Sequence, residues 1–169
     1  MYSLSQYSFV ASFVALGLAA LAYGSYGVSR RRAALAGYAV AAPASWSAPL
    51  PPAATSLGRW GTILTINAFV FLTGTLAFRW AAAGHGPFSN MYEFSVAFVW
   101  GTLGVHLYFE SRYGLRALAI LVLPVCLTML AYAATVSSRI DPLVPALQNS
   151  LLLTIHVAVA IAAYGAFAL

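Results

Sequence analysis

Residues 142–167 read PLVPALQNSLLLTIHVAVAIAAYGAF. A loop with two prolines leads directly into an apolar helix, and His156 lies about two turns inside that helix. An ionisable ring in a membrane-length helix is costly, so such a residue is by default a candidate for a functional site. Imidazole is also a common axial ligand of haem iron. The alternative is a structural histidine whose ring bonds a neighbouring carbonyl, and this segment alone leaves both interpretations open.

The composition is that of an integral membrane protein. The chain has 169 residues, of which 62% are hydrophobic and only 7% charged, whereas soluble domains carry roughly 25% charged residues. All eight basic residues are arginines, and their position at helix ends accounts for the net charge of +5. The lipid bilayer is therefore an expected partner, and nucleic acid is not.

Five apolar segments are long enough to cross about 30 Å of hydrocarbon, which takes about 20 residues. They cover residues 7–28, 60–83, 91–110, 115–136 and 150–169. We therefore predict an all-α fold, a polytopic helical membrane protein that forms a single membrane domain over residues 1–169. Leu169 ends the last segment without a polar flank, and we expect that the chain is truncated there within a longer protein.

The arginines predict the orientation of these helices. No basic residue precedes the first segment, and Arg30, Arg31 and Arg32 follow it, so the N-terminus is expected outside. Alternation then places six arginines in the cytoplasm and two, Arg79 and Arg139, outside. The proline-rich connection 33–59 becomes a cytoplasmic loop, because its four prolines rule out a spanning helix.

An outer loop at residues 84–93, GHGPFSNMYE, has the residues of a shaped turn. Asn90 can cap the third helix, and Glu93 falls in that helix's first turn, where a carboxylate meets the positive end of the helix dipole. One interpretation is only a well-formed helix start. The other is a polar patch, with Tyr92 between these residues, that positions a ligand at the outer surface.

The sequence leaves the roles of His85 and His106 open. His106 lies one turn before Glu110 near the predicted cytoplasmic end of the third helix. His156 belongs to the outer half of the last helix, so one iron atom is not expected to bind both His106 and His156. The chain has no glycine-rich phosphate loop, zinc-type Cys/His cluster or Ser/His/Asp set. Its few acidic residues lie at helix ends or in loops, which disfavours a proton-driven transporter.

Two stretches resemble a known family. GHGPFSNMYEF at 84–94 and LVPALQNSLLLTIHV at 143–157, with YGAF at 164–167, are similar to the haem-handling membrane protein of System II cytochrome c biogenesis, the CcsA or ResC type. The similarity extends from about residue 60 to residue 169. The resemblance implies cytochrome c assembly, in which haem is presented at the outer membrane face for covalent attachment to the Cys-x-x-Cys-His motif of apocytochrome c.

The resemblance also implies a site. His156 would be an axial ligand of the haem iron, the haem would be haem b bound transiently, and Asn90, Tyr92 and Glu93 would shape the outer rim. His85 and His106 match no haem ligand of the family. The second System II membrane subunit, the CcsB or ResB type, would be a partner, in a bacterial inner membrane or a thylakoid-type membrane.

The catalytic residues of such a cytochrome c synthase (haem lyase) complex are not identified by the resemblance. The family's further histidines would lie after Leu169, so this fragment alone is not expected to be active. Two other functions stay open. One is a cytochrome b-like membrane electron carrier, and the other is a membrane transporter or scaffold without haem.

Overall fold

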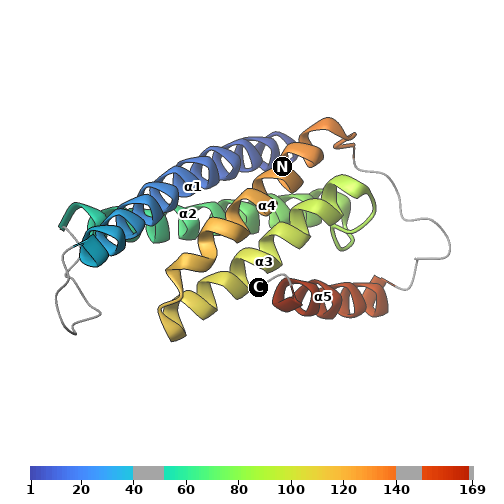
Figure 1. Ribbon diagram of the computed structural model, residues 1–169. Coiled ribbons are helices and arrows are strands. Elements are labelled where there is room, and N and C mark those ends of the chain that lie inside the picture. The colour runs from blue at the N-terminus through green and yellow to red at the C-terminus, as the bar shows by residue number, and fades with distance from the viewer. Residues whose placement is uncertain (40–51, 140–149, 168–169) are drawn as a thin grey trace.

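The structure is a computed structural model that describes residues 1–39, 52–139 and 150–167. The regular elements in these residues are helices, which confirms the predicted all-α class (Figure 1). They are α1 (Tyr2–Ala39), α2 (Pro52–Ala83), α3 (Met91–Tyr113), the 3-10 turn η1 (Arg116–Leu118), α4 (Ala119–Thr135) and α5 (Ser150–Phe167).

Three stretches are long and apolar enough to cross a membrane: Tyr2–Leu35, Thr55–Ala83 and Arg116–Thr135. Exposed tryptophans mark both ends of the second stretch, because Trp60 and Trp80 are 59% and 51% exposed. They are separated by 20 positions (80 − 60), about 30 Å of helix at about 1.5 Å per residue, which matches the thickness of the hydrocarbon. Tryptophan favours the membrane interface. The chain is an integral membrane protein, while a count of five spans and an outside N-terminus remain predictions.

The helices begin and end close to the predicted segments, except around the first connection. We expected a loop over 33–59, but α1 continues to Ala39 and α2 begins at Pro52. The residues after Arg32 are mainly alanine and leucine, which favour helix. A proline is tolerated in the first turn of a helix, so Pro52 can begin α2. Residues 40–51 of the predicted loop, residues 140–149 and Leu169 lie outside the described residues.

The core lies between α1, α2, α3 and α4. Helices α1 and α2 pack along one another, and a Cβ atom at Gly61 would come within 2.8 Å of the Tyr23 ring, so only glycine allows this approach. The largest fully buried apolar side chains are Tyr23, Tyr92, Leu16, Leu72, Leu103, Leu123 and Leu130. The bundle has two polar ends. The loop end contains residues 84–90, and the arginine-rich end contains Arg30, Arg31, Arg32, Arg59, Arg112 and Arg116.

Helix α5 lies beside α3 (Figure 1), and glycines form the contact between them. A Cβ atom at Gly101 would lie 2.2 Å from Cγ2 of Ile161, and one at Gly165 would lie 3.3 Å from the Gly101 backbone. Small residues at both positions let the two helix backbones approach closely, as in other membrane helix pairs. This contact sets the position of the helix that carries His156.

Candidate functional site

His156 lies on the face of α5 that points away from α3. The helix turns by about 100° per residue, so His156 and Gly165, nine positions apart, lie about half a turn from each other. Gly165 faces α3 and His156 is exposed. Its exposed neighbours Leu152 and Val159 are apolar, at 66% and 65% exposure. An imidazole amid apolar side chains is a donor set that fits a porphyrin iron, because the ring can ligate while the side chains cover the macrocycle.

The loop end is built as its sequence predicts. Gly84 has φ of 73° and ends α2 with a hydrogen bond from its N–H to the Trp80 carbonyl, at 2.9 Å. A positive φ is the conformation that glycine adopts without strain. Asn90 is the N-cap of α3, and its side-chain oxygen accepts a hydrogen bond from the Glu93 N–H at 2.9 Å. The predicted capping role of Asn90 is confirmed.

Glu93 does more than begin a helix, because it forms a buried ion pair with Arg79. Nε of Arg79 donates to Oε1 of Glu93 at 2.8 Å, and both side chains are 0% exposed. The other carboxylate oxygen, Oε2, accepts hydrogen bonds from the N–H and the hydroxyl of Ser89, each at 2.8 Å. A carboxylate without such partners would be very costly to bury. The interpretation of Glu93 as only a helix start is therefore incomplete.

Tyr92 is buried between Arg79 and α1. The Arg79 guanidinium carbon lies 4.7 Å from the centre of the Tyr92 ring, a cation–π distance. The ring also lies 5.3 Å from that of Phe9. Its hydroxyl is buried and has no hydrogen-bond partner among the described residues. Tyr92 and Glu93, predicted to shape an outer rim, thus lie beneath the loop and support it from inside.

The same network holds the end of α4. Nη1 of Arg79 donates to the Ser138 carbonyl at 2.9 Å, and Nδ2 of Asn90 donates to the Arg139 carbonyl at 2.7 Å. The backbone after α4 is therefore attached to the loop between α2 and α3. We name the side chains of Arg79, Tyr92, Glu93, Ser89 and Asn90 the loop-end network.

Arg79 was not predicted to belong to this network. In the sequence it contributed only a positive charge to the predicted orientation of the helices. A signal was available, because Arg79 lies in an apolar helix on one side of the loop and Glu93 lies at a helix start on the other. Two opposite charges on either side of a short helix–helix turn are candidates for an ion pair.

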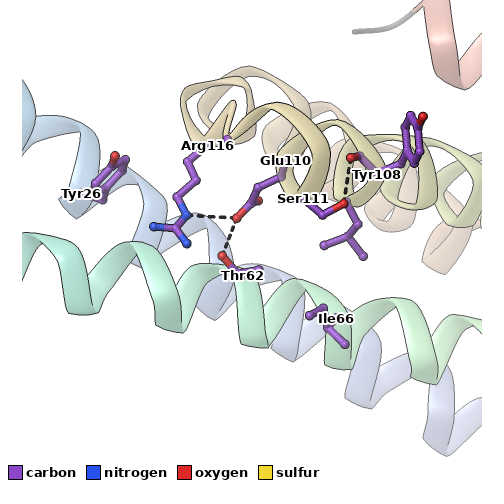
Figure 2. Close-up of a pocket in the computed structure, with 9 residues that line it drawn as sticks. Tyr26, Thr62, Ile66, Tyr108, Glu110, Ser111 and Arg116 are labelled. Carbon is purple, nitrogen blue, oxygen red and sulfur yellow. Dashed lines mark hydrogen bonds and ion pairs between the residues drawn. The ribbon is translucent and has the colours of Figure 1, made fainter.

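A second polar network forms at the arginine-rich end, around Glu110. Its Oε1 accepts hydrogen bonds from the Thr62 hydroxyl and from Nε of Arg116, and its Oε2 accepts one from the Tyr23 hydroxyl. Nε2 of His106 lies 3.4 Å from the same Oε2. One carboxylate thereby connects α1, α2, α3 and η1. Figure 2 shows its bonds with Thr62 of α2 and Arg116 of η1.

His106 is not brought to His156. His106 is 0% exposed, and within the described structure its ring nitrogens make no hydrogen bond of normal geometry. On α3, His106 follows Gly101 by five residues, toward the arginine-rich end. On α5, His156 precedes Gly165 by nine residues. Since Gly101 and Gly165 are in contact and α3 and α5 run in the same general direction in Figure 1, the two histidines lie at opposite depths. Nδ1 of His85 lies 3.0 Å from the Gly86 carbonyl. Among the described residues, no group of three or more His, Cys, Asp or Glu side chains could hold a metal ion.

The chain is similar to several proteins named cytochrome c biogenesis protein CcsA. It is 32% identical over 135 residues to the CcsA of Pyropia yezoensis, a match that covers 78% of this chain and 42% of the relative. It is 36% identical over 138 residues to the CcsA of Gloeobacter violaceus, covering 79% and 40%. The match to the CcsA of Thermosynechococcus vestitus is 34% over 120 residues, covering 69% and 36%.

The chain spans about two fifths of the length of these curated relatives. No protein-family model matches it, and no solved structure matches it significantly. The level of identity over most of this chain nonetheless agrees with the resemblance that its two motifs carry. The chain belongs to the CcsA family of cytochrome c biogenesis proteins.

Proposed function

We propose that this chain handles haem in cytochrome c assembly, with His156 as an axial ligand of the haem iron. The observation that carries the proposal is an exposed histidine, amid apolar side chains, on a helix of a CcsA-type membrane protein. Haem, when bound, supplies the vinyl groups that form thioether bonds with the cysteines of apocytochrome c. The chain's own part is to hold the iron and to exclude water.

The position of His156 supports a site near one membrane surface. Six residues separate it from Ser150, the first residue of α5, so its ring lies about 9 Å along the helix. At that depth a porphyrin edge remains accessible to an external substrate, while its body is surrounded by apolar groups. The face that carries His156 is free of α3, and a bound group would leave the contact between Gly101 and Gly165 unchanged.

The loop-end network supports the site from a distance. It attaches the backbone after α4 to the start of α3, and α3 in turn positions α5. We infer that Asn90, Tyr92 and Glu93 act at the outer rim as positioning residues. In this proposal, haem b is bound transiently, and apocytochrome c and a CcsB-type subunit are the partners. The membrane is a bacterial inner membrane or a thylakoid-type membrane, with the N-terminus of the chain outside.

The orientation has a direct test. A reporter fused after Arg32 should be cytoplasmic, and one fused after His85 should be external, because six of the eight arginines then lie inside. The opposite pair of readouts would place the loop end in the cytoplasm and would contradict an external haem site.

The ligand assignment is tested with His156→Ala in the full-length protein. Haem absorbance of the purified protein and cytochrome c maturation should both fall, while the amount of protein in the membrane stays constant. Added imidazole should partly restore both, because the variant lacks a ligand atom and retains its fold. His85→Ala is the matched control, since its ring bonds only a loop carbonyl among the described residues.

An unchanged haem spectrum and normal maturation in His156→Ala would contradict the assignment. The two alternatives have other signatures. A scaffold or transporter without haem would carry no pigment when purified. An electron carrier would keep its haem and would not transfer it to a peptide that contains Cys-x-x-Cys-His.

A further inference from the structure

A cavity of about 730 Å³ opens at the arginine-rich end of the bundle. Cavities of about 300–1,000 Å³ are typical of sites for small ligands. Four elements contribute to its wall (Figure 2). The side chains that matter here are Tyr26 of α1, Thr62 and Ile66 of α2, Leu107 and Glu110 of α3, and Arg116 of η1.

The charged groups of the wall are arranged for an anion. The Glu110 carboxylate already has a partner on each oxygen and is almost fully buried. Arg116 uses Nε for Glu110, and its two terminal nitrogens make no hydrogen bond with any described residue. Figure 2 shows this guanidinium between Glu110 and Tyr26. A guanidinium presents several donors in one plane, so Arg116 can bind a phosphate or carboxylate while it remains paired with Glu110.

The surroundings of the cavity are basic. The guanidinium of Arg30 lies 5.9 Å from the centre of the Tyr26 ring, and Tyr26 lines the cavity. Arg59 is exposed at the same end. Among the described residues, Glu110 is the one acid there, and its charge is compensated by Arg116. A surface with this net positive charge attracts anions from solution and from the membrane.

The polarity of the cavity changes with depth. Trp60 marks the membrane interface on α2, and Ile66 lies six residues further along that helix, about 9 Å deeper. Ile66 and Leu107 are apolar, whereas Arg116 follows the end of α3 at Tyr113 and lies near the surface. A ligand that fits this gradient has a charged end at the interface and an apolar body toward the hydrocarbon.

We propose that this cavity binds an amphipathic anion, with its phosphate or carboxylate on Arg116 and its apolar body against Ile66 and Leu107. A small inorganic anion would fill only a fraction of the volume. Two sources have this chemistry: the headgroup of an acidic phospholipid, and a haem propionate. The site lies at the end of the bundle opposite His156, and it stands independently of the proposed haem ligand.

The test uses the full chain in lipid nanodiscs and two pairs of probes. Phosphatidylglycerol and phosphatidylcholine are compared by the number of lipids that the protein retains in native mass spectrometry. Haemin and haemin dimethyl ester, which lacks both carboxylates, are compared by titration. Ile66→Trp fills the cavity and replaces none of the residues that bond Glu110. Ile63→Trp is its control on the same helix, since Ile63 does not line the cavity. Arg116→Gln removes the guanidinium, and Arg112→Gln removes an exposed one outside the cavity.

Ile66→Trp and Arg116→Gln should each weaken binding of the anionic probe by about tenfold or more, as expected for the loss of a hydrogen-bonded charge or of its binding space. The two controls should bind as the unchanged chain does.

An effect on phosphatidylglycerol alone identifies a lipid, and an effect on haemin but not on its ester identifies haem. If Arg116→Gln weakens binding of the anionic probe and Ile66→Trp does not, the proposal is overturned, because the charge would then bind the probe outside the cavity. Binding that all four variants retain would also overturn it. His156→Ala should keep this binding, which separates the cavity from the proposed haem ligand.

Discussion

The ion pair between Arg79 and Glu93 offers the sharpest test of how the loop end is held. Arg79→Met keeps most of the apolar length of the side chain and removes its charge. Removing one partner of a buried pair costs about 3–5 kcal/mol, because the other charge remains buried without compensation. Glu93 would keep its two bonds from Ser89, so we expect the lower end of that range. The lost bond from Arg79 to the Ser138 carbonyl adds about 1 kcal/mol.

The chain carries its own reporter for this loss of stability. Cys126, the single cysteine, is 1% exposed in α4, the helix that the loop-end network holds at its C-terminal end. A thiol reagent reaches it only when the structure opens, and the labelling rate follows the open fraction when closing is fast. The total cost of about 4 kcal/mol corresponds to labelling on the order of a thousandfold faster. Arg112→Met, at an exposed position, is the control and should label at nearly the rate of the unchanged chain.

The double variant Arg79→Met with Glu93→Leu completes the experiment. Replacing both charges by apolar groups removes the uncompensated charge, so labelling of Cys126 should be slower than in either single variant. One contradicting result is that each single variant accelerates labelling by less than about threefold. The other is that the free-energy cost of the double variant equals the sum of the costs of the two single variants. Either result would show that the pair does not stabilise the loop end, and the reasoning would be refuted.

Two further predictions concern the other contacts of the bundle. Gly101→Ala should lower cytochrome c maturation at constant protein level, because its Cβ atom would meet Ile161 at 2.2 Å and displace α5. Adding Ile161→Ala should restore maturation, and Gly17→Ala, with no atom within 4 Å, should have no effect. Tyr23→Phe should cost about 1.5–3 kcal/mol, measured by Cys126 labelling, because its hydroxyl donates to the Glu110 carboxylate. The exposed Tyr7→Phe should change the labelling rate little, and equal rates for both variants would contradict a stabilising role of Glu110.

Local features of the chain were predictable because they depend on neighbouring residues. Hydropathy over about 20 residues located the helices, and the spacing of Asn90 and Glu93 predicted the cap of α3. The boundary after Arg32 was missed, since the arginines marked the expected membrane surface while the helix itself continues to Ala39. Helix propensity depends on the residues themselves, so a helix can continue beyond the membrane surface. The two sequence motifs were also sufficient to identify the family, which the CcsA relatives support.

The partners of the charged side chains could not be predicted from the sequence. Tyr23 and Glu110 are 87 positions apart, and they meet because α1 and α3 converge on α2 at the arginine-rich end. Hydropathy predicted that Arg79 lies near a membrane surface, yet it is 0% exposed and paired with Glu93. Likewise, sequence did not show that His156 faces away from α3, because that direction depends on the contact between Gly101 and Gly165.

By itself, the sequence determined that this chain is a helical membrane protein of the CcsA family, with His156 in an apolar helix and a capped helix start at Asn90. Only the tertiary structure decided which charges are buried, which helices they connect, and where a cavity remains beside Arg116. The physical reason is the range of the forces involved. Helix formation and hydropathy act over neighbouring residues, whereas a buried charge in a membrane must find its partner across helices, and the packing of those helices selects it.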